Sequence, residues 1–338
     1  MRFDERLRAL PLLALCLAST SACVPDKVPD QQTVPRCDGV PKKCGPDGTE
    51  DCCATGSVVG GLFQLRNNPM YPATVNDFEL DRFEVTVGRF RQFVADYPHD
   101  KPKAGDGKHP LIDGSGWDEA WNENLPATQE ALIASLKCDA IFRTWTDTAG
   151  GSEALPINCL SWYAAFAFCA WDDGRLPTEA EWNYAAAGGN EQRAYPWASG
   201  PLDAQHAVYG CSADGTSKAP PDGGMPMPTD CTPPGSDIPK VGSRKLGDGK
   251  WGQADLAGSM AEWTLDWFNV PTTPCDNCAN LTNPLSDYPG RTAKGGDWNH
   301  AGDQLLTKSA TGFSVKKGEP SQFFIGVRCA RIKATTKK

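Results

Sequence analysis

The sequence of 338 residues predicts one globular domain of the α+β class, with little regular secondary structure and several disulfide bonds. Hydrophobic residues make up 40% of the chain, and a chain of this length and composition can bury a sizeable core. A domain-like pattern runs from about Val58 to Ile332 without a linker-like break, so one domain is the simplest count. Capped helical patterns predict helices, an even number of cysteines predicts cross-links, and four segments quoted below predict the short strands.

Residues 1–22 have the pattern of an export signal. Three arginines precede an apolar run over 9–18, and small residues follow the run up to Cys23. The run is too short to span a bilayer as a helix. Small residues directly before a cysteine are typical of a bacterial lipoprotein. This pattern predicts lipid attachment at Cys23 and a place in the cell envelope, with simple secretion as the alternative.

Residues 23–57 are expected to form a tether and a cap. Three prolines fall within 24–35, a composition typical of an extended chain. Four cysteines follow in a Gly- and Pro-rich stretch with little apolar content, which predicts a small cap held by disulfides. These four are Cys37, Cys44, Cys52 and Cys53. The folded domain is therefore expected over 58–334.

Cysteine usage agrees with export. Without Cys16 in the signal and Cys23 at its end, twelve of the fourteen cysteines remain, and disulfides are their expected state after export. A zinc site at Cys275 and Cys278 is less expected, because one CxxC motif without a second pair is a poor zinc signature. Twelve cysteines allow many connectivities. The attractive pairings are Cys138 with Cys159 and Cys211 with Cys231, of which the second would close a long loop over 200–240.

Three helices are predicted from caps and periodic apolar residues. Thr86 caps the first, whose apolar residues recur at three- and four-residue steps. Ser161 caps a second helix that extends to Ala170. Thr178 begins the third with a capping box, in which Glu181 bonds back to the backbone. We therefore expect this glutamate to stabilise the helix rather than to catalyse.

The charge balance excludes one class of partner. The formal net charge is -9, and lysines and arginines are not clustered along the chain. Because nucleic-acid phosphates are bound by clustered basic side chains, no nucleic-acid partner is expected.

Four segments in order resemble the formylglycine-generating enzyme family, also called sulfatase-modifying factor domains. They are FELDRFEVTVGRFRQFV (78–94), LPINCLSWYAAFAFCAWDDGRLPTEAEWNYAAAGG with YPWA (155–198), VGSRKLGDGKWGQADLAGSMAEWTLDWF (241–268), and KGGDWNH with FIGVRCAR (294–331). The resemblance implies the family's α+β variant of the C-type-lectin-like fold, with short strands and much irregular backbone. It also implies a disulfide between Cys169 and Cys329.

The resemblance also implies a chemistry that this chain lacks residues to perform. Enzymes of the family oxidise a substrate cysteine to formylglycine with molecular oxygen and with copper held by two cysteines shortly after a GGSW-like motif. Counted from Gly296, the corresponding positions here are His300 and Leu305, and Asp297 replaces the usual serine. One imidazole does not replace a two-thiolate copper site, so neither copper nor oxidase activity is expected.

Calcium is the second cofactor that the resemblance implies. The family binds it in a loop that typically reads GNxxEW, and residues 258–263 here read GSMAEW. A serine hydroxyl is a weaker ligand than an asparagine carbonyl. A weakened calcium site near Ser259 and Glu262 is therefore the most that the sequence predicts.

A non-catalytic binding module is the function that these observations favour. Its partner is expected to be a peptide, a glycan or an envelope protein. The alternatives are an active formylglycine-generating oxidoreductase or another oxidase on the same scaffold, and a structural envelope protein without a small ligand. The candidate binding groove consists of Asp297, Trp298, Asn299, His300 and Arg328, where the resemblance places the family's active groove, because aromatic and charged residues together suit recognition. The alternatives are a structural clamp for Arg328, a buried core position for Trp298 and an ordinary surface histidine for His300.

Overall fold

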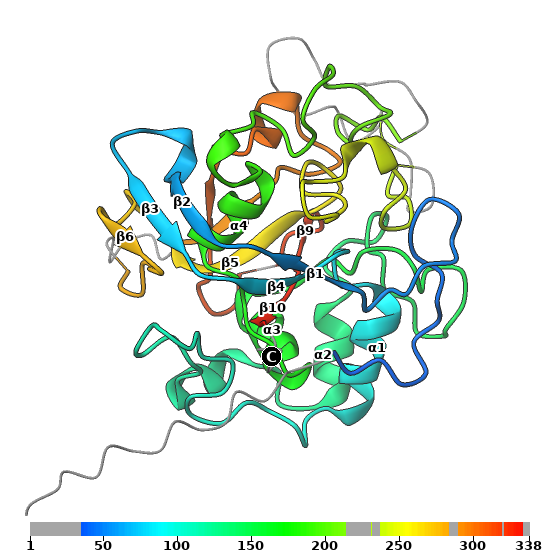
Figure 1. Ribbon diagram of the computed structural model, residues 1–338. Helices are drawn as coiled ribbons and strands as arrows, with labels where there is room; N and C mark the ends of the chain where they lie inside the picture. Colours follow the sequence, from blue (N-terminus) through cyan, green and yellow to red (C-terminus); the bar gives the residue numbers. More distant parts are fainter. Residues whose placement is uncertain (1–34, 214–230, 232–236, 284–289, 320, 334–338) are drawn as a thin grey trace, which may run out of the picture. The chain divides into compact units, whose positions relative to one another are not determined.

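The computed structural model describes residues 35–213, 231, 237–283, 290–319 and 321–333 (Figure 1). Within these ranges the chain forms three small sheets, short helices and long irregular connections, as an α+β domain with little regular structure should. No helix among the described residues is long and apolar enough to cross a bilayer. The expected export signal and the expected lipidation of Cys23 lie outside the described residues.

The first sheet joins the two ends of the domain. Its strands are antiparallel, in the order β1-β4-β10, and Thr55 pairs with Asp81 while Ala330 pairs with Leu80. The strands are β1 (Thr55–Val58), β4 (Phe78–Asp81) and β10 (Ala330–Ile332). Because β1 begins at Thr55, the folded domain starts before residue 58, where the sequence placed its boundary.

The expected cap packs on the domain. Cys44 and Cys52 are buried in one apolar cluster with Phe83 and Val241, so the cap shares a small core with the rest of the chain. The sequence suggested a cap without a core of its own. The cap's few apolar residues instead pack against residues that are distant in the sequence, such as Phe83 and Val241.

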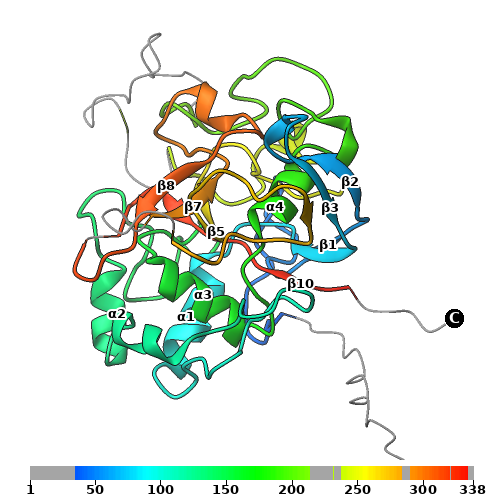
Figure 2. The same cartoon turned by 90° about the vertical axis from the view of Figure 1, so that its left-hand side faces the viewer.

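Two further sheets complete the strands. The second has the order β2-β3-β6, with strands β2 (Gly61–Gln64), β3 (Pro72–Val75) and β6 (Cys275–Asp276). The third has the order β8-β7-β5-β9, with strands β5 (Ala261–Trp267), β7 (Gly290–Lys294), β8 (Thr311–Ser314) and β9 (Ile325–Gly326). Figure 2 shows β8, β7 and β5 side by side, with α4 between them and β3.

The helices begin where their caps predict. Thr86 accepts a bond from the backbone of Arg89, and Ser161 accepts one from that of Ala164. The capping box of Thr178 and Glu181 is present with both bonds. The helices are α1 (Val87–Asp96), α2 (Gln129–Ser135), α3 (Trp162–Trp171) and α4 (Glu179–Ala186). Short 3-10 helices span Leu65–Asn67, Glu119–Asn124, Gly189–Glu191, Lys245–Gly247 and Gly302–Leu305.

Disulfides and aromatic rings hold this irregular backbone together. Cys169 on α3 is joined to Cys329, directly before β10, across 160 residues of sequence. The other pairs are Cys37–Cys53, Cys44–Cys52, Cys138–Cys159, Cys211–Cys231 and Cys275–Cys278. Large rings such as Trp162, Trp182 and Trp298 are fully buried, as a fold with few regular elements requires.

Candidate functional site

The turn after β7 carries the residues that the sequence singled out. Gly295 and Gly296 both have positive φ, at 95° and 64°. A Cβ on Gly296 would lie 2.8 Å from a methyl carbon of Leu305, so the glycine lets the turn close onto this leucine. The turn is therefore fixed tightly against the residue at the second expected cysteine position.

Asp297 organises the turn. Its Oδ1 accepts bonds from the backbone N–H groups of Asn299 (2.9 Å) and His300 (3.1 Å), and its Oδ2 lies 2.6 Å from His300 Nδ1. Burial alone would lower the pKa of His300, but the hydrogen bond and charge of Asp297, with the charge of Asp303, raise the pKa above its ordinary value. The buried aspartate thus holds the imidazole in one orientation and favours its charged form.

Trp298 is fully buried. Its ring packs against those of Phe142 and Phe323, with centroids 4.9 and 6.0 Å away. Trp298 is therefore a core residue, not the exposed contact that the sequence suggested, because the loop bearing Phe142 folds over it. Asn299 is also buried, and only His300 in this turn keeps a partly exposed side chain.

Arg328 is a buried clamp rather than a ligand contact. Its Nε and Nη2 donate to the two carboxylate oxygens of Glu262, at 2.7 and 2.6 Å, and Nη1 donates to the backbone carbonyls of Asp81 and Arg82. Neither Arg328 nor Glu262 is exposed. A bidentate pair of this kind fixes the strands that it joins, and the sequence could not show that the arginine points inward.

The two residues of the weak calcium site that the sequence suggested, Ser259 and Glu262, bond to other protein groups in this structure. Both oxygens of Glu262 accept from Arg328, and one also accepts from Trp182 Nε1 at 2.6 Å. The Ser259 hydroxyl donates to Glu84 at 2.8 Å. Burial, together with the charges of Asp255 and Glu262, raises the pKa of Glu84 well above its ordinary value. The side-chain oxygens of Ser259 and Glu262 are thus engaged with Glu84, Arg328 and Trp182.

The turn also lacks the two thiolate ligands that the resemblance implies for copper. Leu305 is fully buried in an apolar cluster with Trp197, Ala207 and Ala257, so it fills space where the family places a thiolate. Across the described part of the chain, one group of three side chains has metal-binding atoms close together, namely Asp81, Asp172 and Cys329. Arg89 and Arg331 pair with these aspartates, and the cysteine is in a disulfide.

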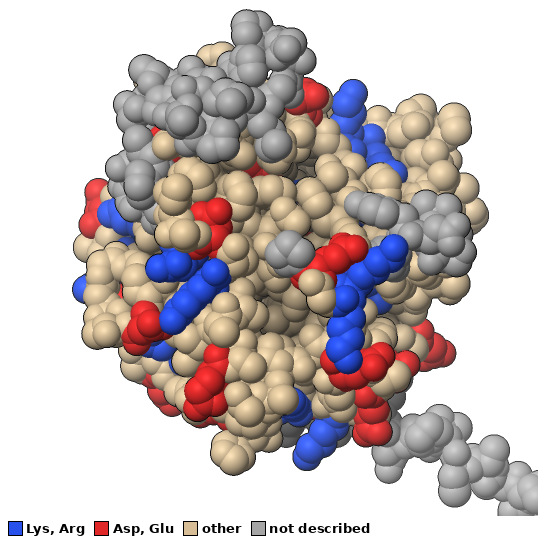
Figure 3. All heavy atoms as spheres, turned by 180° about the vertical axis from the view of Figure 1, so that it is seen from behind, with Lys and Arg blue, Asp and Glu red and all other residues tan. Residues whose placement is uncertain are grey.

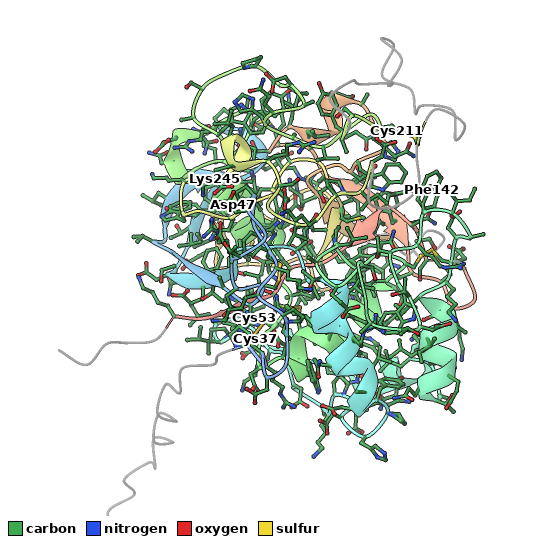
Figure 4. All side chains as sticks on the ribbon, turned by 90° about the vertical axis from the view of Figure 1, so that its right-hand side faces the viewer. Cys37, Asp47, Cys53, Phe142, Cys211 and Lys245 are labelled. Atoms are coloured by element: carbon green, nitrogen blue, oxygen red, sulfur yellow. A yellow bond between two sulfur atoms is a disulfide. The ribbon has the colours of Figure 1, made fainter. Side chains whose placement is uncertain are left out.

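A second segment of the chain closes the turn from outside. The N–H of Gly210 donates to the carbonyl of His300 at 2.9 Å, and that of Cys211 donates to the carbonyl of Trp298 at 2.8 Å. Figure 4 shows Cys211 and Phe142 on the same side of the molecule. A cavity beside Asp297 has a volume of about 10 Å³, room for roughly one water molecule. Four of the five residues expected to form the groove, Asp297, Trp298, Asn299 and Arg328, are buried in the described structure.

An open groove lies nearby, on residues that sequence reasoning missed. It has a volume of about 530 Å³. Arg143 lines it and donates to the carbonyl of Asp139 at 3.4 Å, and it forms no salt bridge with a described carboxylate. Ile141, 57% exposed, lies on the rim. The lining residues are Lys137, Ala140, Ile141, Arg143, Thr144, Trp145, Thr146, Asp147, Gly151, Ser152 and Leu155.

A disulfide and an aromatic contact hold the loop that forms the groove. The Cys138–Cys159 disulfide ties one end of this loop to the chain before α3, and Phe142 anchors its middle on Trp298. The cysteine spacing was the one signal in the sequence that marked the loop, and it did not show that the loop encloses a hollow.

On the face seen in Figure 3, basic and acidic side chains are interspersed, without a continuous basic patch among the described residues.

Comparison with known proteins shows which family this sequence resembles. The model of the sulfatase-modifying factor enzyme 1-like domain matches residues 41–333. Inactive C-alpha-formylglycine-generating enzyme 2 of Bos taurus is 26% identical over 293 residues, which cover 77% of this chain and 88% of the relative. Formylglycine-generating enzyme of Thermomonospora curvata is 30% identical over 266 residues, covering 72% of this chain and 81% of the relative.

The fold is also found among solved structures. The structure of PvdO from Pseudomonas aeruginosa aligns with a TM-score of 0.51 and 17% identity, covering 82% of this chain and 94% of that one. The family match covers most of the chain, including β1 to β10 and the turn at Asp297. The chain therefore belongs to the family of sulfatase-modifying factor enzyme 1-like domains.

Proposed function

We propose that this chain is a non-catalytic member of its family that binds a peptide or protein partner. The observation that carries the proposal is Leu305, which is fully buried and apolar at the position of the second cysteine. A thiolate pair cannot form there, because neither His300 nor Leu305 carries a thiol. The bovine relative is named an inactive enzyme, so the family includes a member that is described as inactive.

The binding surface in this proposal is the open groove around Arg143. The guanidinium is partly exposed and has no salt bridge to a carboxylate among the described residues, so a ligand carboxylate can pair with it in two-bonded geometry. Asp147, the acidic residue of the groove, is paired with Lys137 at 2.8 Å; this hydrogen bond, and to a smaller extent the charge of Arg143, lower the pKa of Asp147. Ile141 offers an apolar contact beside the guanidinium. The groove thus fits a peptide segment in which an acidic side chain is followed by an apolar one.

Export completes the proposal. The sequence pattern before Cys23 suggests a lipid anchor, and the proline-rich residues 24–35 suggest a tether that holds the domain away from a membrane. Six disulfides among the described residues are consistent with folding in an oxidising compartment. The partner would then be a protein of the cell envelope.

Peptide binding by charge-reversed variants tests the groove. The probe is a fluorescent peptide of alternating Asp and Leu, titrated with the full chain, and a peptide of Lys and Leu is the control ligand. Arg143→Glu should weaken binding of the acidic peptide about tenfold or more, because a charge-assisted hydrogen bond contributes about 1.5–3 kcal/mol. Lys308→Glu makes the same charge change at an exposed site outside the groove and should leave the affinity unchanged.

Two results would contradict the assignment of the groove. One is acidic-peptide binding by Arg143→Glu at the affinity of the parent. The other is an equal loss in Lys308→Glu, because it would show a general charge effect instead of a site.

A further inference from the structure

The turn that lacks cysteines lies against a disulfide from another part of the chain. The sulfurs of Cys211 and Cys231 are 3.7 and 3.5 Å from Asn299 Oδ1. The backbone bonds from Gly210 to His300 and from Cys211 to Trp298 fix this placement. The disulfide therefore packs against Asn299, which lies in the same turn as the Asp297–His300 pair.

The amide oxygen of Asn299 suits the reduced cysteines better than the oxidised pair. A disulfide sulfur carries no hydrogen, whereas a thiol is a weak hydrogen-bond donor. Oδ1 accepts S–H hydrogen bonds only after reduction, so this contact stabilises the dithiol relative to the disulfide. Cys52 also has its sulfur close to a carbonyl, 3.3 Å from Pro41 O, but both cysteines of that disulfide are buried.

Access and charge favour one direction of attack. Cys211 is fully buried, whereas Cys231 is partly exposed, so Cys231 is the cysteine that we expect an incoming thiolate to attack. His300 follows Asn299 directly, and its bond to Asp297 favours the imidazolium. A positive charge near cysteines lowers their pKa and stabilises a leaving thiolate.

We propose that Cys211–Cys231 is a thiol–disulfide exchange site whose substrate is a dithiol, either a small molecule or a dithiol protein. A substrate thiolate attacks the sulfur of Cys231, the bond to Cys211 breaks, and Cys211 leaves as a thiolate. The second substrate thiolate then attacks the first substrate sulfur and releases Cys231. Two electrons pass to the protein, the substrate leaves as a disulfide, and its two thiol protons end on Cys211 and Cys231.

Equilibrium reduction of the full chain tests the proposal. The chain is incubated in buffers of reduced and oxidised dithiothreitol, the free thiols are alkylated, and each cysteine pair is quantified by peptide mass spectrometry. Cys211–Cys231 should reach half-reduction at a dithiol-to-disulfide ratio at least tenfold lower than Cys138–Cys159. The latter is the matched comparison, because it too joins one buried and one partly exposed cysteine. Reduction of both pairs at the same ratio would overturn the proposal.

Variants separate the effect of this turn from mere accessibility. His300→Gln should slow the reduction of Cys211–Cys231 by dithiothreitol several-fold, and Asn299→Ala should shift its midpoint toward that of Cys138–Cys159. His206→Gln is the control: His206 Nδ1 lies 2.8 Å from Asp203 in the same three-residue spacing, but its ring packs on Trp197. Equal slowing by His206→Gln, or no effect of His300→Gln in a protein that keeps its other five disulfides, would refute the role of the turn.

Discussion

Replacing Arg328 with methionine should destabilise the domain strongly. The change removes both bonds to Glu262 and both bonds to the carbonyls of Asp81 and Arg82. It leaves the Glu262 carboxylate fully buried, with Trp182 as its remaining donor. Removing one partner of a buried ion pair costs about 3–5 kcal/mol. At about 2 °C per kcal/mol, the low end for large domains, Tm falls by roughly 6–10 °C.

Urea unfolding followed by tryptophan fluorescence measures this loss, with disulfides intact in all variants. The double variant Arg328→Met, Glu262→Gln should recover part of the stability, because position 262 then carries no buried charge and the new amide oxygen still accepts from Trp182. Lys308→Ala is the exposed control and should change the free energy of unfolding by less than about 0.5 kcal/mol.

An Arg328→Met variant as stable as the parent would refute the reasoning. It would mean that the guanidinium does not neutralise Glu262 in solution. Arg328 would then be free to act as the exposed contact that the sequence suggested, and the closed form of the turn would lose its main support.

Three further changes have defined outcomes. Cys329→Ser should add one free thiol, on Cys169, to the denatured protein and lower stability by about 2–5 kcal/mol; an unchanged thiol count would contradict this pairing. Trp298→Ala should cost about 3–5 kcal/mol in urea unfolding, as a core truncation does, and a near-neutral effect would place the ring at the surface. The pKa of His300 is raised in the folded protein, so protonation of its imidazole stabilises the fold. This stabilisation is present in full below the unfolded pKa of about 6.5 and is lost as pH rises through the folded pKa. His300→Gln should therefore destabilise more at pH 5.5 than at pH 9, and an equal loss at both would show that the charge of the pair contributes nothing.

Local signals in the sequence predicted α1, α3 and α4, but not α2 (Gln129–Ser135). The caps at Thr86, Ser161 and Thr178 and the structural role of Glu181 all depend on residues within three or four positions of one another. The fold as a whole was recognised from longer motifs such as RLPTEAEW, and the family match confirms that assignment.

Burial at the turn could not be predicted, because it depends on segments far away in the chain. Trp298 is covered by Phe142, and Arg328 is satisfied by Glu262, which lies 66 residues away. The open groove was missed for the same reason, since a hollow is a property of the folded loop and not of its composition. Residue types alone made the motif DWNH look like a contact surface.

Oxidation of a cysteine peptide in the presence of copper tests the central claim most directly. The purified chain is loaded with Cu(I), exposed to oxygen and a cysteine-containing peptide, and assayed for aldehyde by hydrazide capture and mass spectrometry. A chain with Leu305 buried at the second cysteine position should form no aldehyde and retain no stoichiometric copper at the turn. Aldehyde formation that requires bound copper, and that His300→Gln abolishes, would contradict the claim that this member of the family is non-catalytic.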